Sequence, residues 1–142
     1  MKSINPYLNF PGNTEEAFNF YKKIFGGDFA GDINRFKDTP DASKLNKSDQ
    51  EKVMHIALPL GNNLLMATDA LPSMGFSVTF GNNFYLSIET ESKDEADKLF
   101  HGLSDGGKDE MPMQDQFWGA YFGMLTDKFG VKWMINYTYT KQ

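Results

Sequence analysis

The sequence predicts an α+β protein made of two β-α-β-β-β units in tandem. Two segments carry apolar residues with helical spacing, at Ala17, Phe20, Tyr21 and Ile24 and again at Ala96, Leu99, Phe100 and Leu103. Runs rich in β-branched and aromatic residues precede and follow each of these segments. Since the whole pattern occurs twice in the same order, we infer a duplicated unit. A chain of 142 residues is long enough to fold around such a core without disulfides or a structural metal.

Each predicted helix has a start signal and a stop signal. Asn13 and Ser92 are residues of the N-cap type, and a glutamate, Glu16 or Glu95, follows three positions later. This spacing predicts a capping box, in which the cap side chain accepts a free backbone N–H and the glutamate reaches back to the cap. Glycine pairs at 26–27 and 106–107 end both helices, because glycine readily takes the positive φ angle found after a helix.

Eight strands are expected around the two helices. In the first unit they cover residues 4–10, 28–36, 53–60 and 63–68, and the hairpin turn Gly61-Asn62 joins the last two. In the second unit they cover residues 84–89, 110–113, 119–126 and 131–138, with a turn at 127–130. The strand at 110–113 has the weakest pattern.

The chain is predicted to form a single domain, with unit one at about 1–70, a linker at 71–82 and unit two at about 83–142. Residues 37–52 are charged and poor in large apolar side chains, which predicts a surface loop or a lid. Residues 76–80 alternate in polarity, which fits either an extra edge strand or an arm that packs on a partner subunit.

Composition argues against several functional classes. The chain has 14 basic and 19 acidic residues and a net charge of −5, so it lacks the clustered basic footprint of a nucleic-acid-binding protein. It has no cysteine, which excludes thiolate catalysis and thiolate metal sites and fits a reducing compartment. The sequence shows neither the apolar core of a signal peptide nor a run that would span a membrane. We therefore expect a cytoplasmic protein with no membrane or nucleic-acid partner.

Ordered motifs along nearly the whole chain resemble one branch of a known superfamily. They are Tyr7-Leu8-Asn9-Phe10-Pro11-Gly12-Asn13, Phe20-Tyr21, Phe25-Gly26-Gly27, Val53-Met54-His55, Leu65-Met66-Ala67-Thr68-Asp69, Met111-Pro112, Phe117-Trp118-Gly119 and Phe129-Gly130-Val131-Lys132-Trp133-Met134. In this order they resemble the PhnB-like proteins of the vicinal oxygen chelate superfamily. That superfamily includes glyoxalase I, extradiol dioxygenases, and bleomycin and fosfomycin resistance proteins.

The resemblance implies a glyoxalase-like fold, in which the two units form a curved mixed sheet that encloses a cup, and a homodimer. It does not by itself imply a reaction, because one fold hosts many chemistries. PhnB-like proteins carry a traditional methyltransferase label. For S-adenosylmethionine we would expect a glycine-rich loop after a strand, but Gly26-Gly27 and Gly106-Gly107 both follow predicted helices.

The resemblance also indicates where a metal would be held. In metal-dependent members of the superfamily, four side chains project into the cup from the first and last strand of each unit. By strand position these fall on Asn5, on Leu65 or Met66, on Tyr85 and on Met134. An amide, a phenol and thioether or alkyl groups are poor ligands for a divalent ion, which prefers deprotonated oxygen or imidazole nitrogen. We therefore expect neither the usual metal site nor another cofactor.

His55 is the candidate for acid–base chemistry. It stands in an alternating strand, so it shares one face with Val53 and Ala57 while Ile56 lies on the other. If its face meets the cup, His55 is a general base or a hydrogen-bond donor to a substrate. The alternative is a structural histidine. His101 falls outside the apolar stripe of the second helix and is expected in solvent.

Six residues are candidates for contact with a ligand: Asn5, Met66, Tyr85, Trp118, Tyr121 and Met134. Aromatic residues make up 15% of the chain, and with the 8 methionines they suit either a large core or an apolar binding cup. Trp118 is the strongest candidate because a glycine follows it, where a ligand can approach the backbone closely.

Three functions stay open at this point. The first is a PhnB-like protein that binds a small organic molecule in an aromatic cup without a metal, with its reaction unassigned. The second is a metal-dependent lyase or dioxygenase whose ligands lie elsewhere or come from a partner subunit. The third is a dimeric interaction protein without catalytic activity. Whether the protein is an enzyme is left open, and its metal content would separate the first function from the second.

Overall fold

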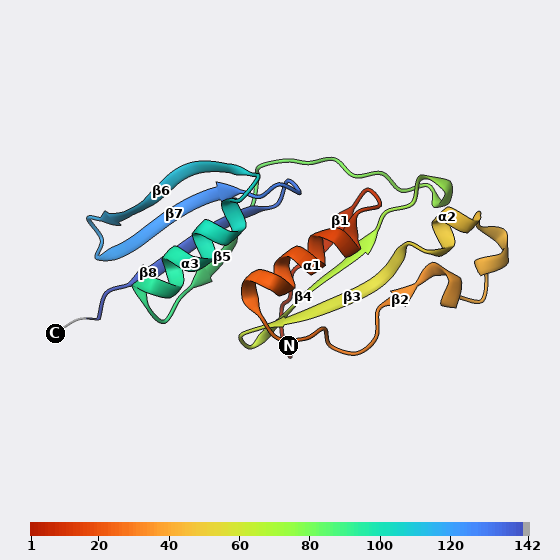
Figure 1. The fold of residues 1–142 in the computed structure, drawn as a ribbon, viewed down its shortest axis with the longest axis horizontal. Coiled ribbons are helices and arrows are strands. Elements are labelled where there is room, and N and C mark those ends of the chain that lie inside the picture. The colour runs from red at the N-terminus through yellow and green to blue at the C-terminus, as the bar shows by residue number, and fades with distance from the viewer. Residues whose placement is uncertain (141–142) are drawn as a thin grey trace. The chain divides into compact units, whose positions relative to one another are not determined.

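A computed structural model describes residues 1–140 of the protein. It divides into two compact units, Met1–Thr79 and Phe80–Gln142. In each unit one long α-helix lies along one four-stranded sheet (Figure 1). The predicted α+β class and the repeated β-α-β-β-β order are thus confirmed.

Unit one consists of β1 (Tyr7–Phe10), α1 (Thr14–Phe25), β2 (Asn34–Arg35), β3 (Val53–Leu60) and β4 (Asn63–Asp69). The strand order is β1-β4-β3-β2. Strand β1 pairs with β4 in parallel, with Tyr7 opposite Met66, and the other pairs are antiparallel. Strands β1 and β4 can pair in parallel because α1, β2 and β3 separate them in the chain, and parallel neighbours need such a long connection.

Unit two repeats this arrangement with β5 (Leu86–Glu89), α3 (Lys93–Ser104), β6 (Lys108–Gln116), β7 (Ala120–Thr126) and β8 (Lys132–Thr138). Its strand order is β5-β8-β7-β6, and β5 pairs with β8 in parallel. The same topology in both units places each first strand beside each last strand.

Each helix packs one apolar face on its sheet. In α3 the buried residues are the predicted Ala96, Leu99, Phe100 and Leu103. In α1 they are Thr14, Ala17, Phe18 and Tyr21, whereas Phe20 is only partly buried. The predicted stripe of α1 was therefore rotated by part of a turn, because Phe18 rather than Phe20 packs edge-on against Phe10 of the sheet.

The capping prediction was half correct. The Ser92 hydroxyl accepts the backbone N–H of Glu95 at 3.0 Å, and Glu95 accepts from the neighbouring Glu91 N–H. Asn13 makes no side-chain cap, and its buried amide oxygen has no hydrogen-bond partner among the described residues. The reason is tertiary: the Asp69 carboxylate, from the end of β4, accepts the Thr14 N–H instead.

Two strands differ in length from their predictions. Strand β2 covers only Asn34–Arg35, because the exposed, glycine-containing segment before it pairs with β3 only through the Ala30 N–H and the Ala57 carbonyl. Strand β6 covers nine residues, Lys108–Gln116, where a weak strand of four was expected. It is an edge strand with Pro112 and several charged side chains, a composition that edges tolerate and that hides the usual strand signal.

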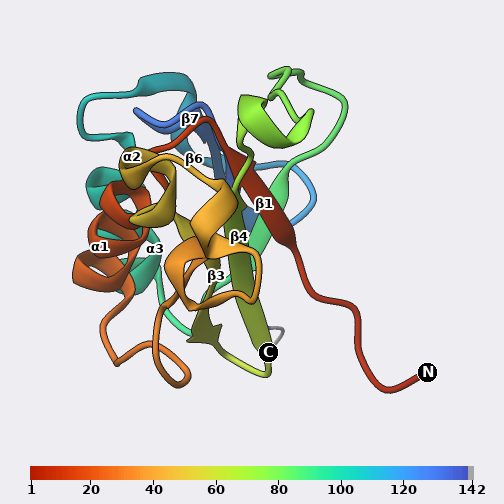
Figure 2. The same ribbon diagram turned by 90° about the vertical axis from the view of Figure 1, so that its right-hand side faces the viewer.

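The region 37–52 is not a plain loop. It contains the short helices η1 (Phe36–Asp38), η2 (Ala42–Lys44) and α2 (Lys47–Gln50), which lie beyond β2 at one end of unit one (Figure 1) and face the viewer in Figure 2. The predicted edge strand at 76–80 does not form; after the turn η3 (Pro72–Met74) the chain there is irregular. Within residues 1–140, no helix has the length and apolar character that crossing a bilayer requires.

Candidate functional site

Each sheet has a helix-free face, which we define as the face opposite its α-helix. Side chains alternate along a strand, so buried residues mark the helix side and their neighbours mark the helix-free side. In unit one, Ile56 and Ala67 lie opposite each other and are buried under α1. In unit two, a Cβ atom added to Gly123 would lie 2.9 Å from Phe100 of α3, which fixes the helix side of β7.

The helix-free face of unit one carries His55, Tyr7 and Met66. The Tyr7 hydroxyl is 3.0 Å from His55 Nδ1, and the two rings are tilted at a centroid distance of 5.7 Å. Tyr7 and His55 belong to β1 and β3, so their bond crosses β4, where Met66 stands opposite Tyr7. Partial burial raises the pKa of Tyr7, so the phenol keeps its proton at neutral pH. The arrangement fixes one imidazole nitrogen and leaves the other for a partner.

Asn5 holds the start of β1 to the β3–β4 hairpin. Its amide oxygen accepts the Leu64 N–H at 2.9 Å and the Asn63 amide at 3.3 Å. Its amide nitrogen donates to the Ser3 hydroxyl at 3.0 Å. The amide of this predicted contact residue is therefore engaged in local hydrogen bonds.

The helix-free face of unit two is richer in apolar groups. Trp118 is 52% exposed, and its ring packs edge-on against Phe122 at 5.8 Å. Met124 and Met134 are directly opposite each other on β7 and β8, on the same face as Phe122. These partly exposed side chains form a continuous apolar strip, which we call the aromatic strip (Trp118, Phe122, Met124 and Met134).

A polar network adjoins the aromatic strip. The Glu110 carboxylate accepts from the Tyr85 hydroxyl at 2.6 Å, from the Thr126 hydroxyl at 2.6 Å and from the Lys132 ammonium. Lys132 also donates to Thr126 at 2.9 Å, and its nitrogen lies 5.3 Å from the centre of the Tyr85 ring. The hydrogen bonds from Lys132, Thr126 and Tyr85 lower the pKa of Glu110 to about 2. The hydrogen bond to Glu110 raises the pKa of Lys132 and that of Tyr85.

Tyr121 does not lie with the other predicted contact residues of unit two. On β7 it stands opposite Tyr137 of β8 and directly precedes Phe122, so the two side chains leave opposite faces of the sheet. Its hydroxyl donates to Asp97 of α3 at 2.5 Å, and Lys93 lies over its ring at 4.6 Å. Tyr121 therefore belongs to the helix side of the sheet, where the bond to Asp97 raises its pKa to about 12.

The positions where the superfamily would hold a metal do not suit one. The side chains at these positions are an amide bonded to Leu64, two thioethers, and a phenol bonded to Glu110. Among the residues that the structure describes, no group of three or more His, Cys, Asp or Glu side chains is placed to hold a metal ion. Hard and borderline divalent ions need anionic oxygen or imidazole ligands, so this donor set does not fit them.

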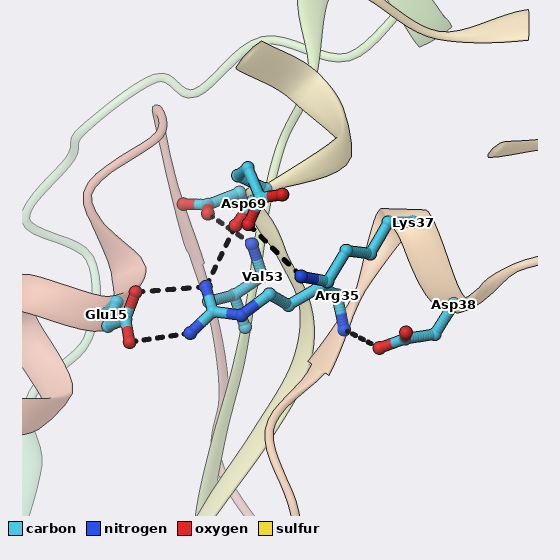
Figure 3. Close-up of polar contacts among 7 residues, drawn as sticks. Glu15, Arg35, Lys37, Asp38, Val53 and Asp69 are labelled. Atoms are coloured by element: carbon cyan, nitrogen blue, oxygen red, sulfur yellow. Dashed lines mark hydrogen bonds and ion pairs between the residues drawn. The ribbon is translucent and has the colours of Figure 1, made fainter. Parts of the chain in front are cut away.

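Unit one also has a polar cavity of about 490 Å³ between the start of α1 and the region 37–52. Figure 3 shows how its walls are joined: both guanidinium nitrogens of Arg35 bond Glu15, at 3.0 and 2.8 Å, and the Asp69 carboxylate accepts the Val53 N–H at 2.8 Å. The Lys52 ammonium donates to the Gly12 carbonyl at 2.9 Å. These bonds from Arg35 and Lys52 fasten the region 37–52 to the start of α1.

Tyr7, Glu110 and Lys132 were missed as site residues by the sequence reasoning. The sequence did contain a signal for Tyr7, because Tyr7 and Tyr85 occupy equivalent positions in the two units. Each directly precedes the leucine, Leu8 or Leu86, that begins the apolar pattern of the first strand. For Glu110 and Lys132 there was none, since charged side chains are usually solvated.

The profile of a protein family described as 3-demethylubiquinone-9 3-methyltransferase matches residues 2–136 of the chain. The chain belongs to this family. It is also 30% identical over 141 residues to Protein YjdN of Escherichia coli, an alignment that covers 94% of this chain and 93% of YjdN.

Solved structures agree with this family and with the fold. The protein PA1353 from Pseudomonas aeruginosa is 38% identical, with a TM-score of 0.83 over 96% of this chain and 97% of its own. A putative 3-demethylubiquinone-9 3-methyltransferase, PhnB protein, from Bacillus cereus is 29% identical, with a TM-score of 0.76 over 96% and 99%. A glyoxalase/bleomycin resistance protein/dioxygenase family enzyme from Burkholderia phytofirmans is 18% identical over 94% and 97%, and its TM-score of 0.63 shows the glyoxalase-like fold. The predicted PhnB resemblance is thus confirmed.

Proposed function

We propose that this PhnB-family protein binds a small organic molecule, without a metal, on the helix-free face of unit two. The observation that carries the proposal is the aromatic strip, in which Trp118 is 52% exposed although its ring contacts Phe117 and Phe122. A planar or acyl group laid on this strip would remove apolar surface from water, at a gain of about 25 cal/mol per Å². Of the predicted contact residues, Trp118, Tyr85 and Met134 would touch the ligand.

On the helix-free face of unit one, His55 is the residue that we propose for proton transfer to a substrate bound there. Its bond to Tyr7 supports this role, because a partner on Nδ1 orients the ring and leaves Nε2 to act on a ligand. Met66 is on the same face and would contribute apolar contact there. In contrast, Asn5 and Tyr121 would not touch the ligand. Asn5 holds the β3–β4 hairpin, and Tyr121 bonds to Asp97 of α3.

Trp118 offers a direct test, since the chain has only two tryptophans and the other, Trp133, is buried with its indole N–H bonded to Asp127. Small aromatic and acyl compounds would be screened by thermal shift, and hits titrated by tryptophan fluorescence and calorimetry. We expect a saturable change in emission that is lost in Trp118→Phe. We expect Trp118→Ala to raise the Kd about tenfold, the loss of an exposed aromatic contact.

The control is Met74→Ala, which removes a large apolar side chain that is 49% exposed in unit one. It should leave both affinity and stability nearly unchanged. Trp118→Ala should cost far less stability than the roughly 3–5 kcal/mol typical of a core tryptophan. Wild-type affinity in Trp118→Ala, for compounds that do bind, would show that the aromatic strip is not the site.

A further inference from the structure

We propose that Lys132 binds an anionic oxygen group of the ligand, so that the ligand of unit two is a small organic anion with an apolar body. This inference rests on the proposed function, since it specifies the chemical class of the molecule that lies on the aromatic strip. It assigns a binding role to the polar network at the end of that strip. Without this role, the network would only be a salt bridge between β6 and β8.

The first argument is the position of the ammonium group. Lys132 precedes Met134 by two residues on β8, so both side chains leave the same face of the sheet. In the ladder, Lys132 faces Thr126 and Met134 faces Met124, which places the cation one row from the aromatic strip. Same-face rows along a strand are about 7 Å apart, roughly the distance between the acid group and the ring centre of an aromatic acid with a short linker.

The second argument is the inventory of donors and acceptors. The two Glu110 oxygens already accept three hydrogen bonds, from Tyr85, Thr126 and Lys132. The ammonium of Lys132 has three N–H groups; two are used on Glu110 and Thr126, and the third is next to Tyr85, which is a weaker acceptor than an anionic oxygen. What the network can offer a ligand is therefore a donor, and a ligand oxygen is the group that it can bind.

The third argument is that this donor is a fixed cation. The Lys132 and Glu110 side chains are only 17% and 21% exposed, so the ammonium has lost part of its hydration. The hydrogen bond to Glu110 raises the pKa of Lys132, which keeps the group protonated and makes it a poor nucleophile or base. A partly desolvated ammonium held in one place binds an anionic oxygen better than a mobile surface lysine does, because little side-chain entropy is left to lose.

Two probes that share one apolar body test this inference. 1-Anilinonaphthalene-8-sulfonate carries an anionic group, and N-phenyl-1-naphthylamine is its neutral counterpart. Their Kd values would be measured by probe fluorescence with the folded protein, and the preference is the ratio of the two. We expect the wild-type protein to prefer the anionic probe about tenfold, the effect of one charge-assisted hydrogen bond.

The variants separate a ligand contact from a structural salt bridge. Lys132→Met should abolish the preference and leave the Kd of the neutral probe unchanged, whereas a purely structural loss would weaken both probes together. Lys132→Arg should keep the preference. The matched control is Lys108→Met, which removes an equal charge from β6 opposite Thr126. The hydrogen bonds of the Glu110 network come from Tyr85, Thr126 and Lys132, so this change should leave the preference unchanged.

The outcomes also keep this inference distinct from the proposed function. If neither probe binds and the Trp118 screen finds no ligand, the proposed function fails and the inference falls with it. If both probes bind equally, or if Lys132→Met keeps the preference, the aromatic strip stands and the role of Lys132 is overturned. A preference that Lys108→Met removes would likewise overturn it, since the attraction would then be general surface charge.

Discussion

Tyr7 and Tyr85 hold the same place in the two units, yet they serve different partners. Each lies on the helix-free face at the start of a first strand, just before a residue of the apolar pattern. Tyr7 meets the imidazole of His55, and Tyr85 donates to the carboxylate of Glu110. Thus a tyrosine orients an imidazole in unit one and donates a hydrogen bond to a carboxylate in unit two. One duplicated position has therefore acquired two different chemical uses.

At the residue scale, the role of His55 can be checked with the one other histidine as control. Compounds that bind would be incubated with the protein in D₂O, and exchange of an acidic C–H followed by proton NMR. If His55 transfers the proton, His55→Gln should still bind but should exchange at least about 100-fold more slowly, the usual contribution of a general base. His101→Gln, on the exposed side of α3, should exchange at the wild-type rate. Equal rates in both variants would assign His55 a structural role.

At the element scale, sequence patterns within one segment predicted the features that depend on contacts within that segment. The stripe of α3, the end of α1 at Gly26, and the strand β3 were predicted correctly, because each depends on residues close together in the chain. Helix α3 ends slightly earlier than predicted, at Ser104, with Asp105 rather than a glycine as its C-cap. The failures came from distant partners. Asp69 displaced Asn13 as the cap of α1, although 55 residues separate it from Thr14. Periodicity within one segment carries no information about such a carboxylate.

The two helix starts form a matched pair for a stability test. Ser92→Ala removes a bonded cap and should lower the free energy of unfolding by about 1 kcal/mol. Asn13→Ala should cost clearly less, because the Asn13 side chain caps nothing and Asp69 remains in place. Urea unfolding followed by circular dichroism measures both. An equal or larger loss in Asn13→Ala would contradict the assignment of the cap to Asp69.

At the scale of the whole molecule, the order of elements was predictable because the sequence repeats it, and the family profile confirms the branch. The site was less predictable. Trp118, Tyr85 and Met134 were expected on one face and share it, but Tyr121 faces α3. A shift of one residue along a strand exchanges the two faces, and no sequence signal fixes that register near the β6–β7 turn.

The proposed homodimer is also a property of the whole molecule. Phe76, Phe80 and Phe84, in and beside the linker, are all more than half exposed, and exposed apolar surface commonly marks protein interfaces. We expect sedimentation at about twice the chain mass of 16.1 kDa. The double change Phe76→Ser and Phe84→Ser should shift the protein toward monomer, while Phe117→Ser should not. A wild-type protein that sediments as a monomer at micromolar concentration would reject the dimer.

Gly107, where the chain leaves α3 for β6, limits how family members can vary. A Cβ atom there would come within 2.3 Å of the Thr126 carbonyl oxygen. Any other residue must displace the end of β7, and with it the hydroxyl that Thr126 offers to Glu110 and Lys132. A relative with a side chain at this position must have rebuilt that corner of unit two. Its ligand preference would then have to be established separately, even where every residue of the aromatic strip is the same.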